Sequence, residues 1–306
     1  MQYVFGPVPS RRLGFSLGVD IIPAKYCTYD CIYCQIGKTT NREIDRRSFF
    51  DPQVIINEII DKTTKIGPVD FITFSGSGEP TLNADLGMLI RELKKNTAIP
   101  VAVITNGSLL YLEEVRKDII EADVVLPSLD AVSEDTFRCI NRPHPALAVE
   151  KVISGIKTFR KEYSREIWLE IMLIRNINDE TIELERMKKI VSGIGAERVQ
   201  LNTVTRPPSE GSTGRLQDRE LARICKLFGP ACEIICSFEK TAEIPSQAEW
   251  TDIIIETLKR RPLTLEDIVN TTNLSHFQAK GRLRDMEEQG LIKSYLFEDN
   301  TFYMAT

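Results

Sequence analysis

The sequence has 306 residues, 42% of them hydrophobic, so the chain can build one sizeable core or a larger and a smaller domain. Its 39 lysines and arginines against 44 aspartates and glutamates give a formal net charge of -5. The electrostatic field of the whole protein therefore does not attract polyanions such as nucleic acids, and any binding of them must be local. No apolar run approaches the roughly 18 residues that span a bilayer, and no secretory signal pattern opens the chain. We therefore expect a cytoplasmic protein without a membrane segment.

Strand-like and helix-like patterns alternate through the first two thirds of the chain. Apolar, β-rich runs predict six strands, at residues 15–22, 70–75, 100–105, 123–129, 167–174 and 198–204. Between them, apolar residues spaced three and four apart predict covering helices, as at Leu86, Leu89 and Leu93. This alternation predicts an α/β fold with a parallel sheet, as a partial (β/α)6 barrel rather than an open doubly wound sheet. In either fold, chemistry is expected at the carboxyl ends of the strands.

The pattern changes near the C-terminus. After a predicted helix at 217–228, a short apolar run at 232–238 and a break at Pro245-Ser246, three helices are expected at 250–259, 263–272 and 275–289. Thr264 is a candidate N-cap of the second of these helices. Two strand-like runs around residues 298–300 close the chain. We therefore expect a barrel domain at 1–240 and a winged helix-turn-helix domain at 247–306.

A cysteine-rich loop directly follows the first predicted strand. In its sequence CTYDCIYC, Cys27, Cys31 and Cys34 are separated by three and then two residues. Seven cysteines in a cytosolic chain of this length are a poor disulfide framework, so close spacings indicate metal or redox sites. Three thiolates on a short loop can hold one iron–sulfur cube and leave one iron open to a chelating molecule. The alternatives are three chance thiols or a structural zinc site, which needs a fourth ligand that this loop lacks.

This spacing, with Tyr33 directly before the third cysteine, resembles the signature of the radical S-adenosylmethionine (SAM) superfamily. The resemblance implies that Cys27, Cys31 and Cys34 ligate a 4Fe-4S cluster. It further implies that SAM chelates the fourth iron through its methionine amino and carboxylate groups, with Tyr33 near the adenine. One electron then breaks the sulfur–C5′ bond of SAM, and the 5′-deoxyadenosyl radical abstracts a hydrogen from the substrate.

Polar and glycine-rich turns follow the next two predicted strands. The turn SGSGEPTL resembles the glycine-rich acidic motif of the superfamily, which implies that Gly76, Gly78 and Glu79 bind the cofactor and that Glu79 receives the methionine amine. Taken alone, this segment reads equally well as a strand-to-helix turn. The third strand ends at Thr105 and Asn106, where family members often place a polar residue on the cofactor. We expect both residues in the cofactor shell.

The later strand ends supply candidate contacts to the cofactor and the substrate. Ser128 and Asp130 follow the fourth strand, where ribose or substrate hydroxyls are expected, although either side chain could instead cap the next helix. Near the last strand, Gln200 and Asn202 offer amides, and Asn202 is expected in the cofactor shell. We assign Asp130 to the substrate and Ser128 to the cofactor.

Two arginines are further candidates for holding a substrate. Arg206 is long enough to bind a carboxylate or phosphate at the barrel mouth, although an arginine before two prolines is as often a solvated loop residue. Arg142 and His144 lie in the rigid turn INRPHP, where His144 is more typical of a turn residue than of a catalytic base. The predicted catalytic set is therefore Asp130, Arg142 and Arg206.

The cysteines outside the loop suggest either an auxiliary cluster or ordinary core residues. Buried free cysteine behaves as a small hydrophobe, which favours the core. These residues are Cys139, Cys225, Cys232 and Cys236.

Residues 1–240 as a whole resemble a subgroup of iron–sulfur oxidoreductases related to the enzyme that builds the tricyclic wyosine base of transfer RNA. The likeness rests on the opening GPVPSRRLGFSLGVDIIP, the cysteine loop, GSGEPTL, and SLDA with NRPH. That enzyme uses additional upstream cysteines for a second cluster, and no cysteine precedes Cys27 here. Wyosine synthesis is therefore not expected.

The leading functional expectation is reductive cleavage of SAM and hydrogen abstraction from a substrate, with flavodoxin or ferredoxin as electron donor. The extra domain favours RNA or protein over a free metabolite. Residues 246–306 carry seven lysines and arginines against ten acidic residues, which weakens the case for nucleic acid, so the domain can equally brace the barrel. The alternatives are a redox- or iron-sensing DNA-binding regulator and an activase that installs a glycyl radical on a partner enzyme.

Overall fold

The computed structural model describes residues 2–235, 250–272 and 274–306. Its centre is an eight-stranded sheet in the order β1-β2-β5-β6-β7-β8-β9-β10. All neighbouring strands are parallel except β1 and β2, which are antiparallel. The strands are β1 (Val4–Ser10), β2 (Gly14–Val19), β5 (Phe71–Phe74), β6 (Val101–Thr105), β7 (Val124–Pro127), β8 (Glu166–Leu173), β9 (Arg198–Thr203) and β10 (Cys232–Ile234).

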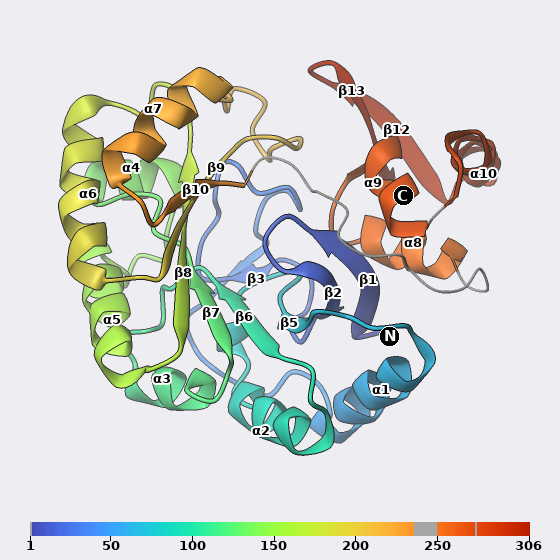
Figure 1. The fold of residues 1–306 in the computed structure, drawn as a ribbon, viewed down its shortest axis with the longest axis horizontal. Helices are drawn as coiled ribbons and strands as arrows, with labels where there is room; N and C mark the ends of the chain where they lie inside the picture. The colour runs from blue at the N-terminus through green and yellow to red at the C-terminus, as the bar shows by residue number, and fades with distance from the viewer. Residues whose placement is uncertain (1, 236–249, 273) are drawn as a thin grey trace.

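Helices form an arc outside the strands (Figure 1). Each turns an apolar stripe toward the sheet, as where α5 buries Val152, Ile156 and Phe159 at the predicted helical spacing. The helices of this region are α1 (Pro52–Lys65), η1 (Pro80–Leu82), α2 (Leu86–Asn96), α3 (Glu113–Ile119), α4 (Glu134–Ile140), α5 (Val149–Glu162), α6 (Thr181–Ile194) and α7 (Asp218–Phe228). A separate pair of two-residue strands, β3 (Tyr26–Cys27) and β4 (Asn41–Arg42), lies in the loop after β2.

The predicted α/β fold and all six predicted strands are confirmed, as β2 and β5 to β9. The structure adds β1 and β10 at the two edges of the sheet. β1 was not predicted because Gly6, Pro7 and Pro9 interrupt its apolar pattern, and an edge strand tolerates proline since one side of its backbone needs no partner. β10 occupies the start of the apolar run predicted at 232–238, of which residues 236–238 lie outside the described part.

The C-terminal unit has its own small core. Its elements are α8 (Trp250–Leu258), β11 (Leu263–Thr264), α9 (Leu265–Thr272), α10 (His276–Glu288), β12 (Ile292–Phe297) and β13 (Asn300–Ala305). Ile254, Leu283 and Ile292 belong to a buried cluster separate from the barrel core. Thr264 caps α9 as expected, since its Oγ1 accepts the Asp267 backbone N–H at 3.1 Å. Three helices and a terminal hairpin appear in the predicted order, while the winged-helix assignment and the boundaries at 240 and 247 stay predictions.

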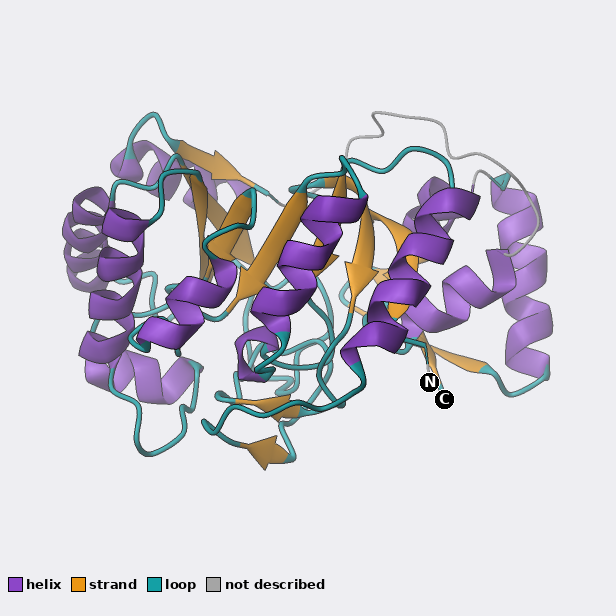
Figure 2. Cartoon of the chain, turned by 90° about the horizontal axis from the view of Figure 1, so that it is seen from below, coloured by secondary structure: helices purple, strands orange, loops and turns teal. Residues whose placement is uncertain are grey.

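This unit lies beside β1, at one end of the molecule (Figures 1 and 2). Helices α8 and α9 pack on β1 and so cover the edge of the sheet. Arg260 Nη2 donates to the Gln2 carbonyl at 2.7 Å, and Phe297 packs against the barrel cluster that contains Ile32 and Val204. Within the described residues, no helix has the length and apolar character needed to cross a membrane.

Candidate functional site

The three loop cysteines lie on the segment that follows β2. Cys34 N donates to the Cys31 carbonyl at 3.1 Å, so these two residues share one turn. Ile32 N donates to the Ile140 carbonyl at 2.9 Å, which fastens the loop to the end of α4. Cys27 and Cys31 line one cavity, and Cys34 lines the cavity that adjoins it. The loop therefore directs all three thiols toward one region.

These thiols are costly to ionise without a counter-charge. Burial raises the pKa of all three, that of Cys27 to about 12. Backbone N–H groups act in the opposite direction, as where Ile36 and Gly37 hydrogen-bond the sulfur of Cys34. A coordinated metal removes the thiol proton outright, so the loop is suited to thiolates that a metal centre stabilises.

Two asparagine amides point at two of the sulfurs. Asn106 Nδ2 lies 3.6 Å from Cys27 Sγ and donates to Thr28 Oγ1 at 2.7 Å. Asn141 Nδ2 lies 3.4 Å from Cys31 Sγ. Hydrogen bonds to sulfur lower the charge on a thiolate and help set the potential of an iron–sulfur cluster. Asn106 was predicted near the cofactor, whereas the role of Asn141 beside Cys31 was not.

The glycine turn after β5 packs against the backbone of the cysteine loop. A Cβ on Gly78 would lie 1.8 Å from the Tyr26 carbonyl oxygen, directly before Cys27. Gly76 has φ +144°, and a Cβ there would lie 2.4 Å from the carboxyl carbon of Asp20. Both positions therefore require glycine, Gly78 for close approach and Gly76 for its backbone conformation as well.

The Glu79 carboxylate is buried and holds four donors. Its Oε1 accepts from Thr105 Oγ1 at 2.6 Å and from both the backbone N–H and the hydroxyl of Thr81. Its Oε2 accepts from Asn106 N at 2.7 Å. Three of these donors converge on Oε1 and one reaches Oε2, so the carboxylate is held mainly through Oε1 while Oε2 keeps an acceptor position. Glu79 thus ties the ends of β5 and β6 together beneath the site, and its predicted contact with the methionine amine stays a prediction.

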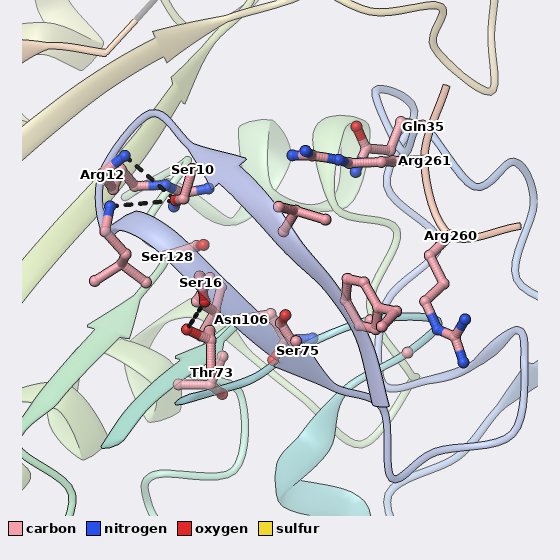
Figure 3. A pocket seen from close by; sticks show the side chains of 18 of the residues that line it. Ser10, Arg12, Ser16, Gln35, Thr73, Ser75, Asn106, Ser128, Arg260 and Arg261 are labelled. Carbon is pink, nitrogen blue, oxygen red and sulfur yellow. Dashed lines mark hydrogen bonds between the residues drawn. The ribbon is translucent and has the colours of Figure 1, made fainter. Parts of the chain in front are cut away.

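Two adjoining cavities open over this region, and Figure 3 shows residues that line the larger of the two. One, of about 290 Å³, is lined by Cys27, Cys31 and residues of the glycine turn, and by several arginines. The other, of about 230 Å³, is lined by Tyr33, Cys34 and Asp130. The cavities share five lining residues, which are Arg11, Arg12, Gln35, Ser128 and Arg206. The cysteine loop and the strand ends therefore face a common space.

The family model of the radical SAM superfamily matches residues 21–186, more than half of the chain. This stretch contains the three loop cysteines, the glycine turn and Asp130. The chain belongs to the radical SAM superfamily. Members of this superfamily are enzymes that bind a 4Fe-4S cluster and SAM.

Relatives of this radical SAM chain include proteins of similar length. The UPF0026 protein MJ1312 of Methanocaldococcus jannaschii is 33% identical over 313 residues, covering 99% of this chain and 96% of that protein. A protein of Brachyspira hyodysenteriae named GTPase Obg is 41% identical over 293 residues, covering 95% of this chain. This chain spans only 43% of the length of that second protein.

Solved radical SAM structures share the barrel fold. A structure of TYW1 with a lysine-pyruvate adduct bound has a TM-score of 0.52 and 20% identity, covering 73% of this chain and 75% of that chain. A radical SAM methyltransferase from Sphaerobacter thermophilus has a TM-score of 0.55 and 18% identity, covering 72% of this chain and 66% of that chain. At these identities, the likeness shows the fold, which is the partial barrel expected from the strand pattern.

The loop fits a radical SAM cluster better than a single metal ion. Across residues 2–235, 250–272 and 274–306, no three His, Cys, Asp or Glu side chains form a group that could hold one ion. A single zinc needs every sulfur within about 2.3 Å of the metal. Cysteines of a cube each bind a different iron and stand further apart. The three partly buried loop thiols match the ligands of a cube, and two of them have a side-chain amide within hydrogen-bonding distance of the sulfur.

Asp130 positions other side chains of the radical SAM site. Its Oδ2 accepts from Tyr33 Oη at 2.6 Å and from Asn141 Nδ2 at 2.7 Å, and its Oδ1 accepts from Met172 N at 3.0 Å. Burial raises the pKa of Asp130 to about 6, against the effect of these donors. Asp130 lines the smaller cavity, but its lone pairs are largely used inside the chain. Its main contacts therefore orient Tyr33 and the amide beside Cys31.

Ser128, Thr105 and Asn202 line the cavities, and their predicted contacts with the cofactor stay predictions. Ser128 lines both cavities, and its backbone N–H donates to the Thr105 carbonyl at 3.0 Å. Asn202 lines the smaller cavity, where its Nδ2 donates to Glu170 at 2.9 Å. Gln200, by contrast, lines neither cavity and donates to Glu233 at 2.8 Å.

The two arginines predicted to hold substrate lie in different surroundings. Arg206 lines both cavities, as expected. Arg142 lines neither and forms an ion pair with Glu210 at 2.5 Å. The structure thus does not bring Arg142 to the barrel mouth, because its backbone turns with φ 44° and its side chain meets the segment after β9. His144 lies in the same turn and accepts the Ala146 N–H at 3.3 Å, as a turn residue does.

The remaining cysteines do not form a second cluster within the described residues. Cys139 is exposed on α4, so the interpretation as a core residue is wrong for this cysteine. Cys225 and Cys232 pack against the barrel core and hydrogen-bond each other, which agrees with their interpretation as core residues. Cys236 lies outside the described residues.

Proposed function

We propose that this chain holds a 4Fe-4S cluster on Cys27, Cys31 and Cys34 and binds SAM in the cavity beside them. The observation that carries the proposal is the cavity of about 290 Å³ that Cys27 and Cys31 share with Gly78, Thr105 and the glycine turn. When bound, the cluster and SAM supply reductive cleavage of the sulfur–carbon bond of SAM and hydrogen abstraction from a substrate. An oxidoreductase or transferase reaction would follow from that step.

The residues of this chain would position the cofactor. Gly76 and Gly78 line the cavity and would bind the methionine end through their backbone, in a turn that packs directly against Asp20 and the Tyr26 carbonyl. Ser128 lines the same cavity, and its hydroxyl is suited to hydrogen-bond the ribose or the methionine group, whereas the hydroxyl of Thr105 already donates to Glu79 and would act by holding that carboxylate. Tyr33 would lie near the adenine, held by its hydrogen bond to Asp130.

The amides of Asn106 and Asn141 would tune the cluster. Each is itself fixed by a second contact, Asn106 by Thr28 and Asn141 by Asp130. Such outer hydrogen bonds hold a donor in one orientation and keep the thiolate charge partly neutralised. We propose that a small redox protein such as flavodoxin or ferredoxin provides the electron.

The cluster assignment is tested by iron and sulfide analysis after anaerobic reconstitution. The parent should hold about four irons per chain. Cys27→Ala, Cys31→Ala and Cys34→Ala should each lose most of that iron, because each removes the ligand of one iron. Cys225→Ala and Cys232→Ala are matched controls on the same fold and should keep it. Retained iron in all three loop variants, or its loss in a control, would contradict the assignment.

A further inference from the structure

Five arginines line the larger cavity, and they come from three parts of the chain. Arg11 and Arg12 belong to the turn between β1 and β2, Arg206 follows β9, and Arg260 and Arg261 follow α8 of the C-terminal unit. Figure 3 shows Arg12, Arg260 and Arg261 around the cavity, with Asn106 and Ser128 on its barrel side. The C-terminal unit thus forms part of the wall of the proposed active site.

Two of these arginines are neutralised by carboxylates. Arg12 forms an ion pair with Glu170. Arg260 forms ion pairs with Asp20 at 3.1 Å and with Glu256 at 2.9 Å. The Arg12 pair lies within the barrel, and of the two Arg260 pairs the one with Asp20 joins the C-terminal unit to the barrel, so both charges are already compensated. Arg11 donates to two neutral partners, Asn202 and Thr205, each at 3.2 Å.

Arg206 and Arg261 have no ion pair among the described residues. Arg206 Nη1 donates to Gln35 Oε1 at 3.4 Å, and Arg261 Nη2 donates to the Pro9 carbonyl at 3.2 Å. Arg261 Nε is buried without a hydrogen-bond partner. The carboxylate whose charge reaches both arginines is that of Asp267, which accepts the Thr264 N–H at 3.1 Å.

The two guanidinium groups also repel each other. Burial lowers the pKa of Arg261 to about 9, and the charge of Arg206 is the next cause. Two neighbouring cations in a partly buried cavity are unfavourable unless an anion binds between them. The unused Nε donor of Arg261 adds to this cost, because a buried donor without an acceptor loses its hydration.

We propose that Arg206 and Arg261 bind a phosphate group of a small organic substrate inside the cavity. Guanidinium forks match phosphate oxygens in pairs, and two positive charges match a phosphate dianion better than a single carboxylate. The inference deepens the proposed function and rests on it, since the same cavity holds Cys27 and Gly78. A phosphorylated metabolite then replaces RNA or protein as the expected substrate, because the C-terminal unit helps to close the cavity.

The test uses binding to the full chain before cluster reconstitution, with inorganic pyrophosphate as the probe in titration calorimetry. Arg206→Gln and Arg261→Gln should each weaken binding roughly 10- to 100-fold, the effect of one charge-assisted hydrogen bond. Arg223→Gln, exposed on α7, is the matched control and should bind like the parent. Thermal unfolding of each variant checks that the substitution has not disturbed the fold.

Three results would overturn the inference. The first is a parent that does not bind pyrophosphate at physiological salt, or variants that bind it equally well. The second is unchanged pyrophosphate binding with weakened SAM binding in reconstituted Arg206→Gln and Arg261→Gln, which would assign the pair to the SAM carboxylate. The third is that Arg206→Gln and Arg261→Gln weaken the binding of a short RNA but leave the binding of pyrophosphate unchanged. The proposed phosphate site is not needed for the cleavage of SAM. A parent protein that does not cleave SAM would therefore count against the proposed function and not against the phosphate site.

Discussion

Replacing Gly78 by alanine should destabilise the protein by roughly 3 kcal/mol or more. The new Cβ would lie 1.8 Å from the Tyr26 carbonyl oxygen and 2.7 Å from Ile22 Cγ2. The carbonyl cannot rotate away like a flexible side chain, because it also accepts the Glu79 N–H at 3.1 Å. The segment that carries Cys27 must therefore shift, and we expect Gly78→Ala to lose iron on reconstitution as well as stability.

Denaturant unfolding of the cluster-free protein measures this effect, with Gly193→Ala as the control. Gly193 lies in α6 and is exposed, and a Cβ there would meet nothing within 4 Å. Alanine in a helix should raise the free energy of unfolding by about 0.5–1 kcal/mol. A Gly78→Ala protein with parental stability and full iron content would mean that the close contact is not required.

The second large effect is expected at Glu79. Glu79→Ala leaves the Asn106 and Thr81 backbone N–H groups without their acceptor, and each buried unpaired donor costs about 1–3 kcal/mol. Glu79→Gln has the same shape but replaces one acceptor oxygen by an NH₂ group, so one donor must then face another. We expect the alanine variant to be destabilised by about 3–5 kcal/mol and the glutamine variant by less.

Thermal and denaturant unfolding of both variants, beside Glu185→Gln, test this prediction. Glu185 is exposed on α6, so its glutamine variant should match the parent within about 0.5 kcal/mol. If Glu79 only receives the amine of SAM, its variants should unfold like the parent and lose SAM affinity alone. That result would contradict the positioning role argued from its four donors.

The barrel could be predicted because its signals are local. Each parallel strand is buried on both faces and reads as a short apolar run, and each helix repeats its apolar stripe within a few turns. The cysteine spacing is local as well, which is why Cys27, Cys31 and Cys34 could be identified from one loop. Edge strand β1 could not, because its prolines suit an edge position that only the finished sheet defines.

The side-chain partners of the site were out of reach of a sequence pattern. Asn141 reaches Cys31 from the end of α4, 110 residues further along the chain. Arg261 reaches the barrel from the C-terminal unit, where nothing in its local sequence distinguishes it from a surface arginine. Arg142 was expected at the mouth from its position in the chain alone, and its ion pair with Glu210 joins segments 68 residues apart. Such contacts depend on how the crossovers stack around the sheet.

The most direct test of the account is the formation of 5′-deoxyadenosine. The reconstituted parent is incubated without oxygen with dithionite and SAM, and the product is quantified by chromatography and mass spectrometry. We expect formation in the parent and in Cys225→Ala, and none above background in Cys27→Ala, Cys31→Ala or Cys34→Ala. A parent with a fully loaded cluster that forms no 5′-deoxyadenosine and does not bind SAM would contradict radical SAM chemistry in this chain.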